Sequence, residues 1–362
     1  MNSGYGRADQ YGGRSRHIVD YGNAKIPVTI FSRTNSNERP DDAITVNTVS
    51  LPLRYNAKRY TMAVLRQSAP KKRAIGGGFD RALARKIARF DLKDVAVLHT
   101  WEWIPETLRA VKRLNPKIKI VRDVVVNRYH EFYSGTPIVR EDELTDIFLS
   151  PSSFSTRCLK EWGIPVDKIV EIPFGVDSDL FRPETGREKS PVRFAFTGAI
   201  SKRKGVDTLL RVWKKLDLHD GELHLYGKLR SDARSALQGA KNVRRYGHVP
   251  LYDELPKNHI YVFPSTLEGS AKSVYEALAC GLPVITTPNS GSIVRDGVDG
   301  CIVKAGDEAM LADAMARLYR DESMRTTMGA SARARAEGFT WRRYAHSVWD
   351  AYAALDARIS VT

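Results

Sequence analysis

Short apolar runs alternate with longer amphipathic stretches along most of this 362-residue chain, and no other feature limits its fold as strongly. The alternation is typical of parallel strands joined by crossover helices, so it predicts an α/β fold. In the first half we expect strands at residues 27–31, 94–99, 117–126, 146–150 and 169–173, and a helix at 104–114. In the second half we expect strands at 192–197, 222–226, 243–246, 260–263 and 283–287, and helices at 206–216, 270–280, 308–319, 324–337 and 341–355.

Chain length and one stretch of linker-like composition predict two domains. A single hydrophobic core rarely grows to 362 residues. Residues 174–191 are rich in Gly, Pro, Ser and charge, as interdomain connections are. We therefore expect two facing Rossmann-like domains with parallel sheets, at 1–180 and 181–340, and a terminal helix at 341–362 that crosses back to the first domain. Ligands of such sheets bind outside the carboxyl ends of the strands, which predicts a cleft between the domains.

The bulk composition is that of a globular protein, with 42% hydrophobic and 27% charged residues. No apolar run approaches the roughly 20 residues that a membrane-spanning helix needs. The polar, Gly-rich N-terminus does not resemble a signal peptide. Cys158, Cys280 and Cys301 are far apart and odd in number, which is typical of reduced thiols. These features predict a cytoplasmic protein.

The formal net charge of +15 is concentrated in one segment. Residues 54–89 contain eleven Lys or Arg and one acid, Asp80, and they supply about two-thirds of the excess. Such a segment attracts an anionic partner, such as an acidic membrane surface or a phosphorylated substrate. An ordinary solvated surface is an equally good interpretation. No nucleic-acid-binding motif accompanies the segment, so nucleic acid is not expected as a partner.

The most informative motif runs from Phe263 to Ile285. A strand ends, a Gly/Ser loop follows, and a helix begins, which leaves unpaired backbone N–H groups that can bind phosphate. Glu268 lies on the loop and Glu276 lies eight residues later, a separation of about 12 Å if it were all helix. That distance places one carboxylate at a donor sugar and the other at a ribose, with a diphosphate between them. Carboxylates suit this task because they accept two hydroxyl hydrogen bonds at once.

This motif resembles that of the retaining glycosyltransferases with the GT-B fold, known as family 4 or group 1. The resemblance rests on Glu268, seven residues, Glu276, an Ala-rich helix and the strand motif Gly281-Leu282-Pro283-Val284. The aromatic-Gly pair that usually follows the first Glu is replaced here by Gly269-Ser270-Ala271. The string from Ile172 to Pro183 also resembles the interdomain string of that family. The resemblance therefore implies a GT-B fold with the nucleotide sugar bound by the second domain.

A second segment, Phe196 to Gly205, resembles the strand and basic loop that hold the donor diphosphate in this family. Lys204 matches the Lys of the family. The position of its Arg is occupied by Ala199, for which Lys202 or Arg203 can compensate. The leaving nucleotide diphosphate gains negative charge in the transition state, and a nearby cation stabilises that charge. With such cations present, no divalent metal and no other cofactor is expected.

The first half carries weaker candidates. Gly12 and Gly13 resemble a glycine-rich loop that lets backbone N–H groups approach the donor phosphates or the acceptor. The first strand of the family should precede that loop, but residues 1–10 show no strand pattern. The resemblance also implies a His close to the reacting carbon, for which His130 is the best match and Asp123 a competing position. For His130, as for His99 at the end of a predicted strand, a structural role is an equally good interpretation.

Three further motifs are interpreted structurally. Asp177-Ser178-Asp179 has the form of a metal-binding pair, but it lies in the linker string and predicts a turn with a cap. The serines in residues 142–154 follow a strand and predict a helix N-cap. Gly76–Gly78 has neither a preceding strand nor a following Lys-Ser, so it predicts a mobile connection rather than a phosphate loop.

The resemblance implies transfer of a hexose, with retention, from a UDP- or GDP-sugar to a glycan, lipid-linked or small-molecule acceptor. A non-catalytic module that binds a nucleotide or a glycan is the alternative. Peripheral contact of residues 54–89 with the inner membrane face is compatible with both. The expected catalytic residues are Glu268, Lys204 and His130. The expected donor-binding residues are Glu276, Lys202, Arg203, Gly198, Gly227, Gly269, Ser270, Lys272, Ser273, Val274, Gly12 and Gly13.

Overall fold

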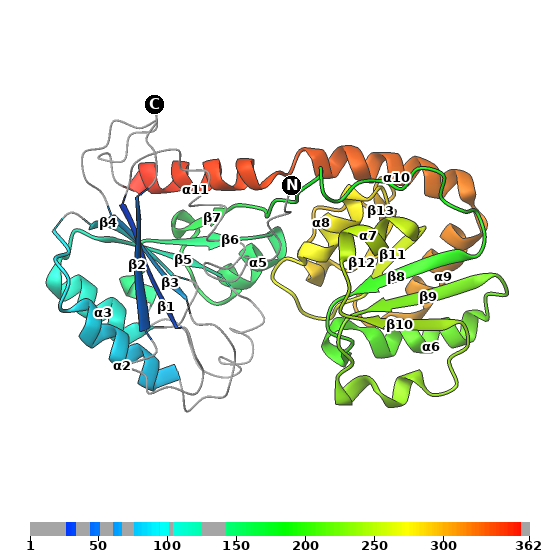
Figure 1. Ribbon diagram of the computed structural model, residues 1–362, viewed down its shortest axis with the longest axis horizontal. Helices are drawn as coiled ribbons and strands as arrows, with labels where there is room; N and C mark the ends of the chain where they lie inside the picture. Colours follow the sequence, from blue (N-terminus) through cyan, green and yellow to red (C-terminus); the bar gives the residue numbers. More distant parts are fainter. Residues whose placement is uncertain are drawn as a thin grey trace.

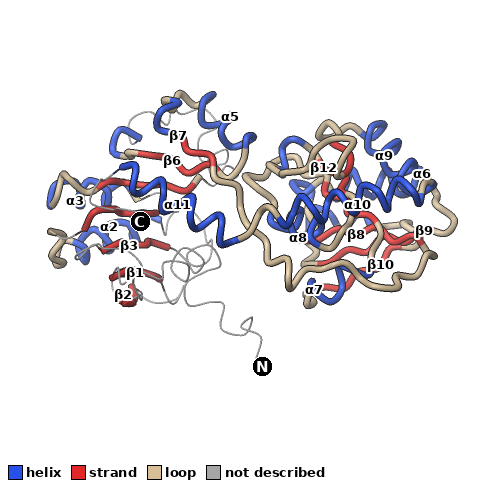
Figure 2. Tube along the Cα trace, turned by 90° about the horizontal axis from the view of Figure 1, so that it is seen from above, coloured by secondary structure: helices blue, strands red, loops and turns tan. Residues whose placement is uncertain are grey.

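The computed structural model describes residues 27–33, 44–50, 61–66, 76–93, 95–100, 104–124 and 142–355. These residues form two halves that lie side by side, each built around one twisted sheet (Figures 1 and 2). Gly12, Gly13 and His130, expected at the site, lie outside the described residues, as does the whole segment before β1.

The first half contains a seven-stranded sheet in the order β2-β1-β3-β4-β5-β6-β7. Its described neighbours pair in parallel except β1 and β2, which are antiparallel. The expected all-parallel sheet therefore has an antiparallel edge strand. The strands are β1 (Pro27–Arg33), β2 (Ile44–Ser50), β3 (Thr61–Arg66), β4 (Val95–Thr100), β5 (Lys119–Asp123), β6 (Ile147–Ser150) and β7 (Ile169–Glu171).

Three helices accompany this sheet: α2 (Gly76–Ile87), α3 (Pro105–Leu114) and α5 (Ser153–Glu161). The mobile connection expected at Gly76–Gly78 is wrong, because these glycines begin α2. The carboxylate of Asp80 accepts hydrogen bonds from the backbone N–H groups of Glu106 and Thr107, both at 2.9 Å. It thereby caps the start of α3 and holds α2 against it, so tertiary contacts outweigh the poor helix propensity of glycine.

The second half contains a six-stranded, wholly parallel sheet in the order β10-β9-β8-β11-β12-β13. Its central strands are buried on both faces, as parallel strands between two helix layers are. The strands are β8 (Val192–Thr197), β9 (Gly221–Tyr226), β10 (Val243–Gly247), β11 (Ile260–Phe263), β12 (Val284–Thr286) and β13 (Gly300–Ile302). The helices are α6 (Val206–Leu216), α7 (Leu251–Glu254), α8 (Lys272–Ala279), α9 (Glu308–Arg320) and α10 (Glu322–Glu337).

The described chain crosses between the halves twice, and the two crossing segments are hydrogen-bonded to each other. The backbone N–H of Val176 donates to the carbonyl of Phe339 at 2.9 Å, and Val176 forms an isolated β-bridge with Thr340. A Cβ atom on Gly175 would lie 2.2 Å from the backbone nitrogen of Trp341, so only glycine allows this approach. We call this pairing the paired hinge.

Helix α11 (Trp341–Leu355) follows the paired hinge and lies over the first half (Figures 1 and 2). The hydroxyl of Tyr352 lies 2.5 Å from His99 Nδ1 at the end of β4. The last helix of the chain is therefore bonded to the strands of the first half.

Candidate active site

The loops that follow β8 and β11 lie next to each other at the carboxyl edge of the second sheet, because these strands are parallel neighbours. The backbone N–H of Thr266 donates to the carbonyl of Arg203 at 3.0 Å and joins the two loops. This edge is where ligands of open α/β sheets bind. The expected donor residues from both motifs therefore meet at one place.

The loop after β9 lies against the loop after β8, and their backbones are in close contact. Gly227 has φ +135°, and a Cβ atom there would lie 2.0 Å from the carbonyl oxygen of Gly198. Gly198 itself has φ +120°, with nothing within 4 Å of where its Cβ would be. Only glycine fits at Gly227, and the edge of the sheet stays open above Gly198.

Two cations converge on the carboxylate of Glu268. Lys204 Nζ lies 2.5 Å from Glu268 Oε1, and Arg203 also forms an ion pair with that oxygen. Arg203 further donates to the carbonyl of Leu267 at 2.8 Å. The three side chains sum to a charge of +1, which favours an anionic ligand beside them.

The environment of Lys204 is only partly aqueous. Its side chain is 15% exposed, and Nζ lies 4.9 Å from the centre of the Phe263 ring. Burial lowers the pKa of Lys204, while the Glu268 carboxylate opposes part of that shift. The two side chains are therefore coupled, and a ligand that takes up Lys204 must replace the carboxylate as its partner.

Glu276 lies on α8, one helix turn beyond Lys272. Its side chain is half-buried, and burial raises its pKa to about 7, with Lys272 opposing the shift. Lys272 Nζ lies 5.1 Å from the centre of the Trp341 ring, beside the paired hinge. A carboxylate with this pKa changes charge near neutral pH, which is characteristic of functional sites.

The start of α8 offers backbone rather than side-chain groups. Its N-cap residue is Ala271, which supplies no side-chain cap. Ser270 and Ser273 face inward: the Ser270 hydroxyl lies 3.2 Å from that of Tyr275, and Ser273 bonds to Tyr261. The side chain of Val274 is fully buried. The helix begins at Lys272 rather than near residue 270, so Glu268 lies on a loop and not on a helix.

Lys202 and Arg203 differ in position although both were expected to compensate for Ala199. Lys202 is exposed, and its backbone N–H donates to Asp232 at 3.2 Å. Arg203 instead contacts Glu268 directly. Of the two, only Arg203 shares the Glu268 carboxylate with Lys204.

The polar groups at the carboxyl edge of the first sheet are buried and bonded to one another. His99 Nε2 lies 3.1 Å from Asp123 Oδ2, and His99 Nδ1 contacts the Tyr352 hydroxyl. All three side chains are less than 5% exposed. Of the two interpretations of His99, this arrangement favours the structural one.

Two serines that the sequence marks only as a helix cap also reach this site. Ser152 caps α5 by accepting from the N–H of Ser155 at 3.1 Å, which confirms the predicted cap. Its hydroxyl and that of Ser155 also donate to the carbonyl of Gly269, across the interface between the halves. A sequence carries the capping signal but no sign of this second partner. The turn predicted at Asp177 is likewise confirmed, since its carboxylate accepts from the N–H groups of Asp179 and Leu180.

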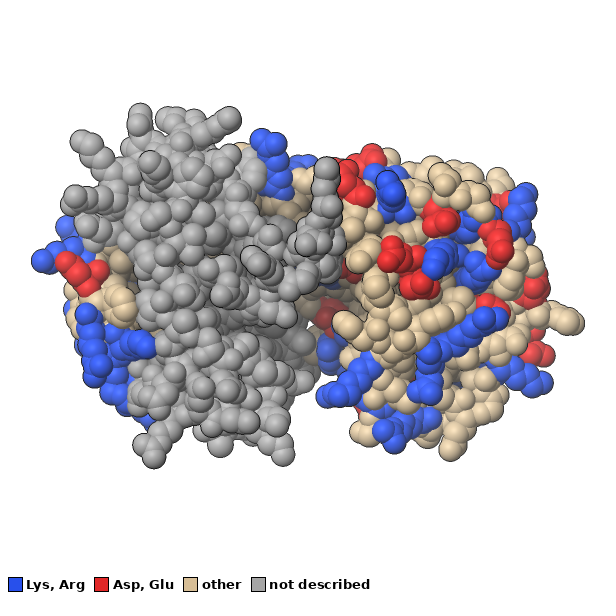
Figure 3. All heavy atoms as spheres, viewed as in Figure 1, with Lys and Arg blue, Asp and Glu red and all other residues tan. Residues whose placement is uncertain are grey.

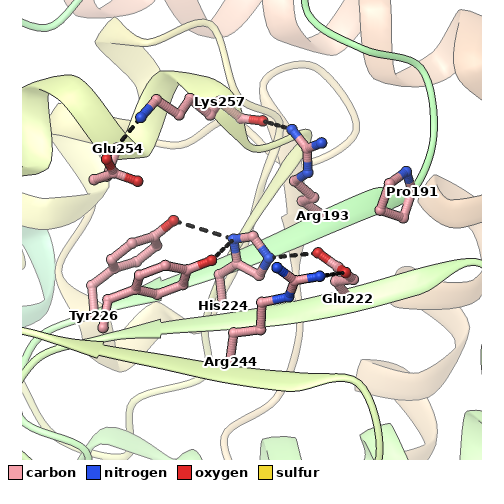
Figure 4. A pocket seen from close by; sticks show the side chains of 9 residues that line it. Pro191, Arg193, Glu222, His224, Tyr226, Arg244, Glu254 and Lys257 are labelled. Carbon is pink, nitrogen blue, oxygen red and sulfur yellow. Dashed lines mark hydrogen bonds and ion pairs between the residues drawn. The ribbon is translucent and has the colours of Figure 1, made fainter.

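A separate cavity of about 230 Å³ lies on the second sheet and is lined by side chains of β8, β9 and β10 (Figure 4). On β9 the lining extends from Glu222 to Tyr226 at the end of the strand. Most of its charged side chains pair with one another: Glu222 with His224 and Arg244, and Glu254 with Lys257. These pairs compensate each other's charge.

The chain is similar in sequence to known glycosyltransferases. Residues 191–321 match the family described as Glycosyl transferases group 1. The D-inositol 3-phosphate glycosyltransferase of Corynebacterium aurimucosum is 27% identical over 296 residues, covering 73% of this chain and 67% of that protein. The enzyme of the same name from Stackebrandtia nassauensis is 25% identical over 397 residues, covering 93% of this chain and 84% of that protein. Against other curated relatives the chain spans about half of their length, such as 53% for that of Paenarthrobacter aurescens.

Solved structures give the same fold. HepE of Anabaena, in complex with UDP-glucose, superposes with a TM-score of 0.68 at 13% identity, covering 91% of this chain and 100% of that chain. Sucrose-phosphate synthase of Thermosynechococcus elongatus superposes with a TM-score of 0.65 at 19% identity, covering 83% of this chain and 90% of that chain. The class is thus an α/β protein with the parallel sheets of GT-B glycosyltransferases. Residues 191–321 match a group 1 glycosyltransferase domain, and the fold and relatives together support a hexosyltransferase enzyme.

In the described part of the chain, no helix combines the length and apolar character that crossing a membrane requires. Within the same residues, no three His, Cys, Asp or Glu side chains are grouped so that they could hold a metal ion.

Proposed function

We propose that the chain transfers a hexosyl group, with retention, from a nucleotide-diphosphate sugar to an acceptor hydroxyl. The observation that carries the proposal is the convergence of Lys204 and Arg203 on Glu268 beside the uncapped start of α8. This arrangement combines cations for a diphosphate, N–H groups for its oxygens and carboxylates for sugar hydroxyls.

Charge stabilisation of the leaving group is the main catalytic task that we assign to the site. The bond between the anomeric carbon and the diphosphate oxygen breaks, and its electron pair stays on that oxygen. Lys204 and Arg203 stabilise the resulting charge, which is largest in the transition state. The acceptor oxygen forms the new bond on the same face, and its proton passes to the departing phosphate. Glu268 orients the sugar, and no protein nucleophile takes part.

The second carboxylate serves binding. Glu276, ionised, accepts hydrogen bonds from the two ribose hydroxyls of the donor. Since Lys204 and Arg203 supply the positive charge, the proposed reaction needs no divalent metal.

Relatives support the choice of donor and acceptor. The Anabaena structures hold UDP or UDP-glucose, and the structures of TarM and of the pneumococcal O-GlcNAc transferase GtfA hold UDP, which favours UDP over GDP. The relatives named D-inositol 3-phosphate glycosyltransferase favour a phosphorylated small-molecule acceptor over a glycan or a lipid-linked one.

The basic character of the first half supports an anionic acceptor or membrane surface. Lys and Arg side chains gather at the edge of the molecule where α2 and α3 lie (Figure 3). Both helices carry basic residues in their last turn, including Arg85, Lys86, Lys112 and Arg113. We propose that this face draws the chain toward anionic acceptors, or to the cytoplasmic face of an acidic membrane.

Thermal unfolding with a panel of nucleoside diphosphates tests the donor site. A ligand that binds only the folded protein raises its unfolding temperature, and we expect UDP to do so more than GDP or ADP. Sugar release from UDP-glucose, with and without EDTA, then tests turnover, and EDTA should leave the rate unchanged. Stabilisation without any sugar release or transfer would favour the non-catalytic binding module. No stabilisation by any nucleoside diphosphate would overturn the proposal.

A further inference from the structure

The N-terminal turn of α5 lies against the loop that carries Glu268. Figures 1 and 2 show α5 at the side of the first half that faces the second half. The hydroxyls of Ser152 and Ser155 both donate to the carbonyl of Gly269, at 2.5 and 2.8 Å. Ser152 Oγ also lies 3.1 Å from Ser155 Oγ, but its contact with the Gly269 oxygen is the shorter one. Each hydroxyl has one proton, and both serines can direct it to this single oxygen of the other half.

An apolar contact holds the residue on the other side of Glu268. Leu267 packs against a cluster of the first half that contains Phe154 of α5. The other buried members of that cluster are Val124, Phe148, Leu159 and Ile164. The first half therefore contacts both neighbours of Glu268: the side chain of Leu267 and the backbone carbonyl of Gly269.

Backbone hydrogen bonds within the second half hold the same loop. The N–H of Glu268 donates to the carbonyl of Asn289 at 2.9 Å, and the N–H of Ala271 to that of Ser290 at 3.0 Å. At Gly291, a Cβ atom would lie 2.2 Å from the Gly269 oxygen and 2.6 Å from Ser152 Oγ. The absence of a side chain at Gly291 is thus what lets the serines reach the loop.

We propose that Ser152 and Ser155 form an interdomain latch that positions Glu268. When the halves are together, the latch holds the loop so that the Glu268 carboxylate meets Lys204 and Arg203. When the halves separate, the Gly269 carbonyl and the Leu267 side chain lose their partners in the first half, and the loop is held by the second half alone. Ser152 and Ser155 are positioning residues, and the effect on turnover rests on the proposed function.

The alternative is that these serines only stabilise α5. Ser152 has both roles, because its oxygen caps the helix while its proton serves the latch. Ser155→Ala removes a latch proton and leaves the cap acceptor in place. Ser152→Asp keeps a cap acceptor but sets a carboxylate against the Gly269 carbonyl. Thr156→Val is the matched control, since its hydroxyl contacts Ser150 and Glu171 of the first half only.

The rate of sugar transfer from UDP-glucose by the full chain tests the interdomain latch. We expect kcat to fall about 5- to 10-fold in Ser155→Ala and at least about 30-fold in Ser152→Asp, as one hydrogen bond is lost or made repulsive. The affinity for UDP should stay within twofold, because the nucleotide contacts lie in the second half. Thr156→Val should keep wild-type kcat.

Small-angle X-ray scattering gives a readout that needs no activity. Ser152→Asp should raise the radius of gyration relative to wild type, and Thr156→Val should not. Unchanged kcat and unchanged scattering in both serine variants, with normal unfolding temperatures, would overturn the latch. If wild type itself neither binds UDP nor transfers sugar, the proposed function fails, and scattering still decides whether the latch exists.

Discussion

The carboxyl edges of the two sheets have opposite chemistry, although both end parallel strands. On the second sheet, Lys204, Arg203 and Glu268 stay partly exposed and hold an excess of positive charge. On the first sheet, His99 and Asp123 are buried and bonded, with Tyr352 of α11 completing the group. We therefore expect the same fold position to serve ligand binding in one half, while in the other half it attaches the terminal helix.

Burial explains the difference better than residue type does. Charged groups that remain accessible can exchange one partner for a ligand at low cost. Polar groups closed off from water cannot, because a lost partner leaves them unsatisfied. The comparison therefore predicts activity changes at one edge and stability changes at the other.

Removing the cation of Lys204 should have the largest effect. We expect Lys204→Met to lower kcat for UDP-glucose about 100- to 1,000-fold, because the leaving group loses a charge partner that acts mainly in the transition state. The donor KM should change far less. Lys214→Met is the control: this exposed lysine of α6 bonds to the carbonyl of Gln238, away from the site. A large rise in KM with unchanged kcat would contradict the assigned role.

Glu276→Gln should weaken donor binding about 10-fold or more, because charge-assisted hydrogen bonds to the ribose become neutral ones. The pKa of Glu276 is about 7, so wild-type donor affinity should rise with pH from 6 to 8 as the carboxylate ionises. The Gln variant should lack this dependence. The steady-state KM for the donor, measured from about pH 6 to 8, tests this prediction. A wild-type KM that does not change with pH would contradict it.

The same substitution should stabilise the fold at high pH. The folded pKa of Glu276, about 7, lies above the ordinary value of 4.5, so the folded state binds this proton more tightly. The stability that the protonated form contributes is lost as pH rises from about 4.5 to 7. The Gln variant avoids this loss, which reaches about 3 kcal/mol at pH 8. Denaturant unfolding at about pH 4 and pH 8 measures the free energy of unfolding, and at the lower pH the two proteins should be nearly equal.

Tyr352→Phe should have the smallest effect on catalysis. It removes one hydrogen bond to buried His99, and we expect a loss of about 1–2 kcal/mol in the free energy of unfolding. The values of kcat and KM should stay within twofold of wild type. A fall in kcat beyond tenfold would show that the first sheet edge takes part in the reaction, against the contrast drawn between the two edges.

Much of the fold follows from local sequence patterns. In the second half, β8 and β11 begin and end where their apolar runs do, because parallel strands buried on both faces must be apolar throughout. β3 was not predicted because it lies inside the basic segment, where charge hides its short apolar run. β13 was not predicted either: it begins with Gly300, a residue type that is depleted in strands.

The site was predictable at the level of residue types but not of contacts. Lys204, Arg203, Glu268 and Glu276 follow from the two motifs and the parallel pairing of their strands. That Arg203 faces Glu268 while neighbouring Lys202 faces outward depends on the turn between β8 and α6. The serine contacts to Gly269 depend on how the halves pack, which no local pattern encodes.

The paired hinge joins both crossings at one point. Because Val176 is bonded to Phe339 and Gly175 packs against Trp341, we expect any separation of the halves to be a rotation about this point. A protease cut in one crossing would leave the halves tethered through the other strand. Two fluorophores flanking the pivot would then hold a constant separation, while a pair spanning α5 and the Gly269 loop would report each opening event.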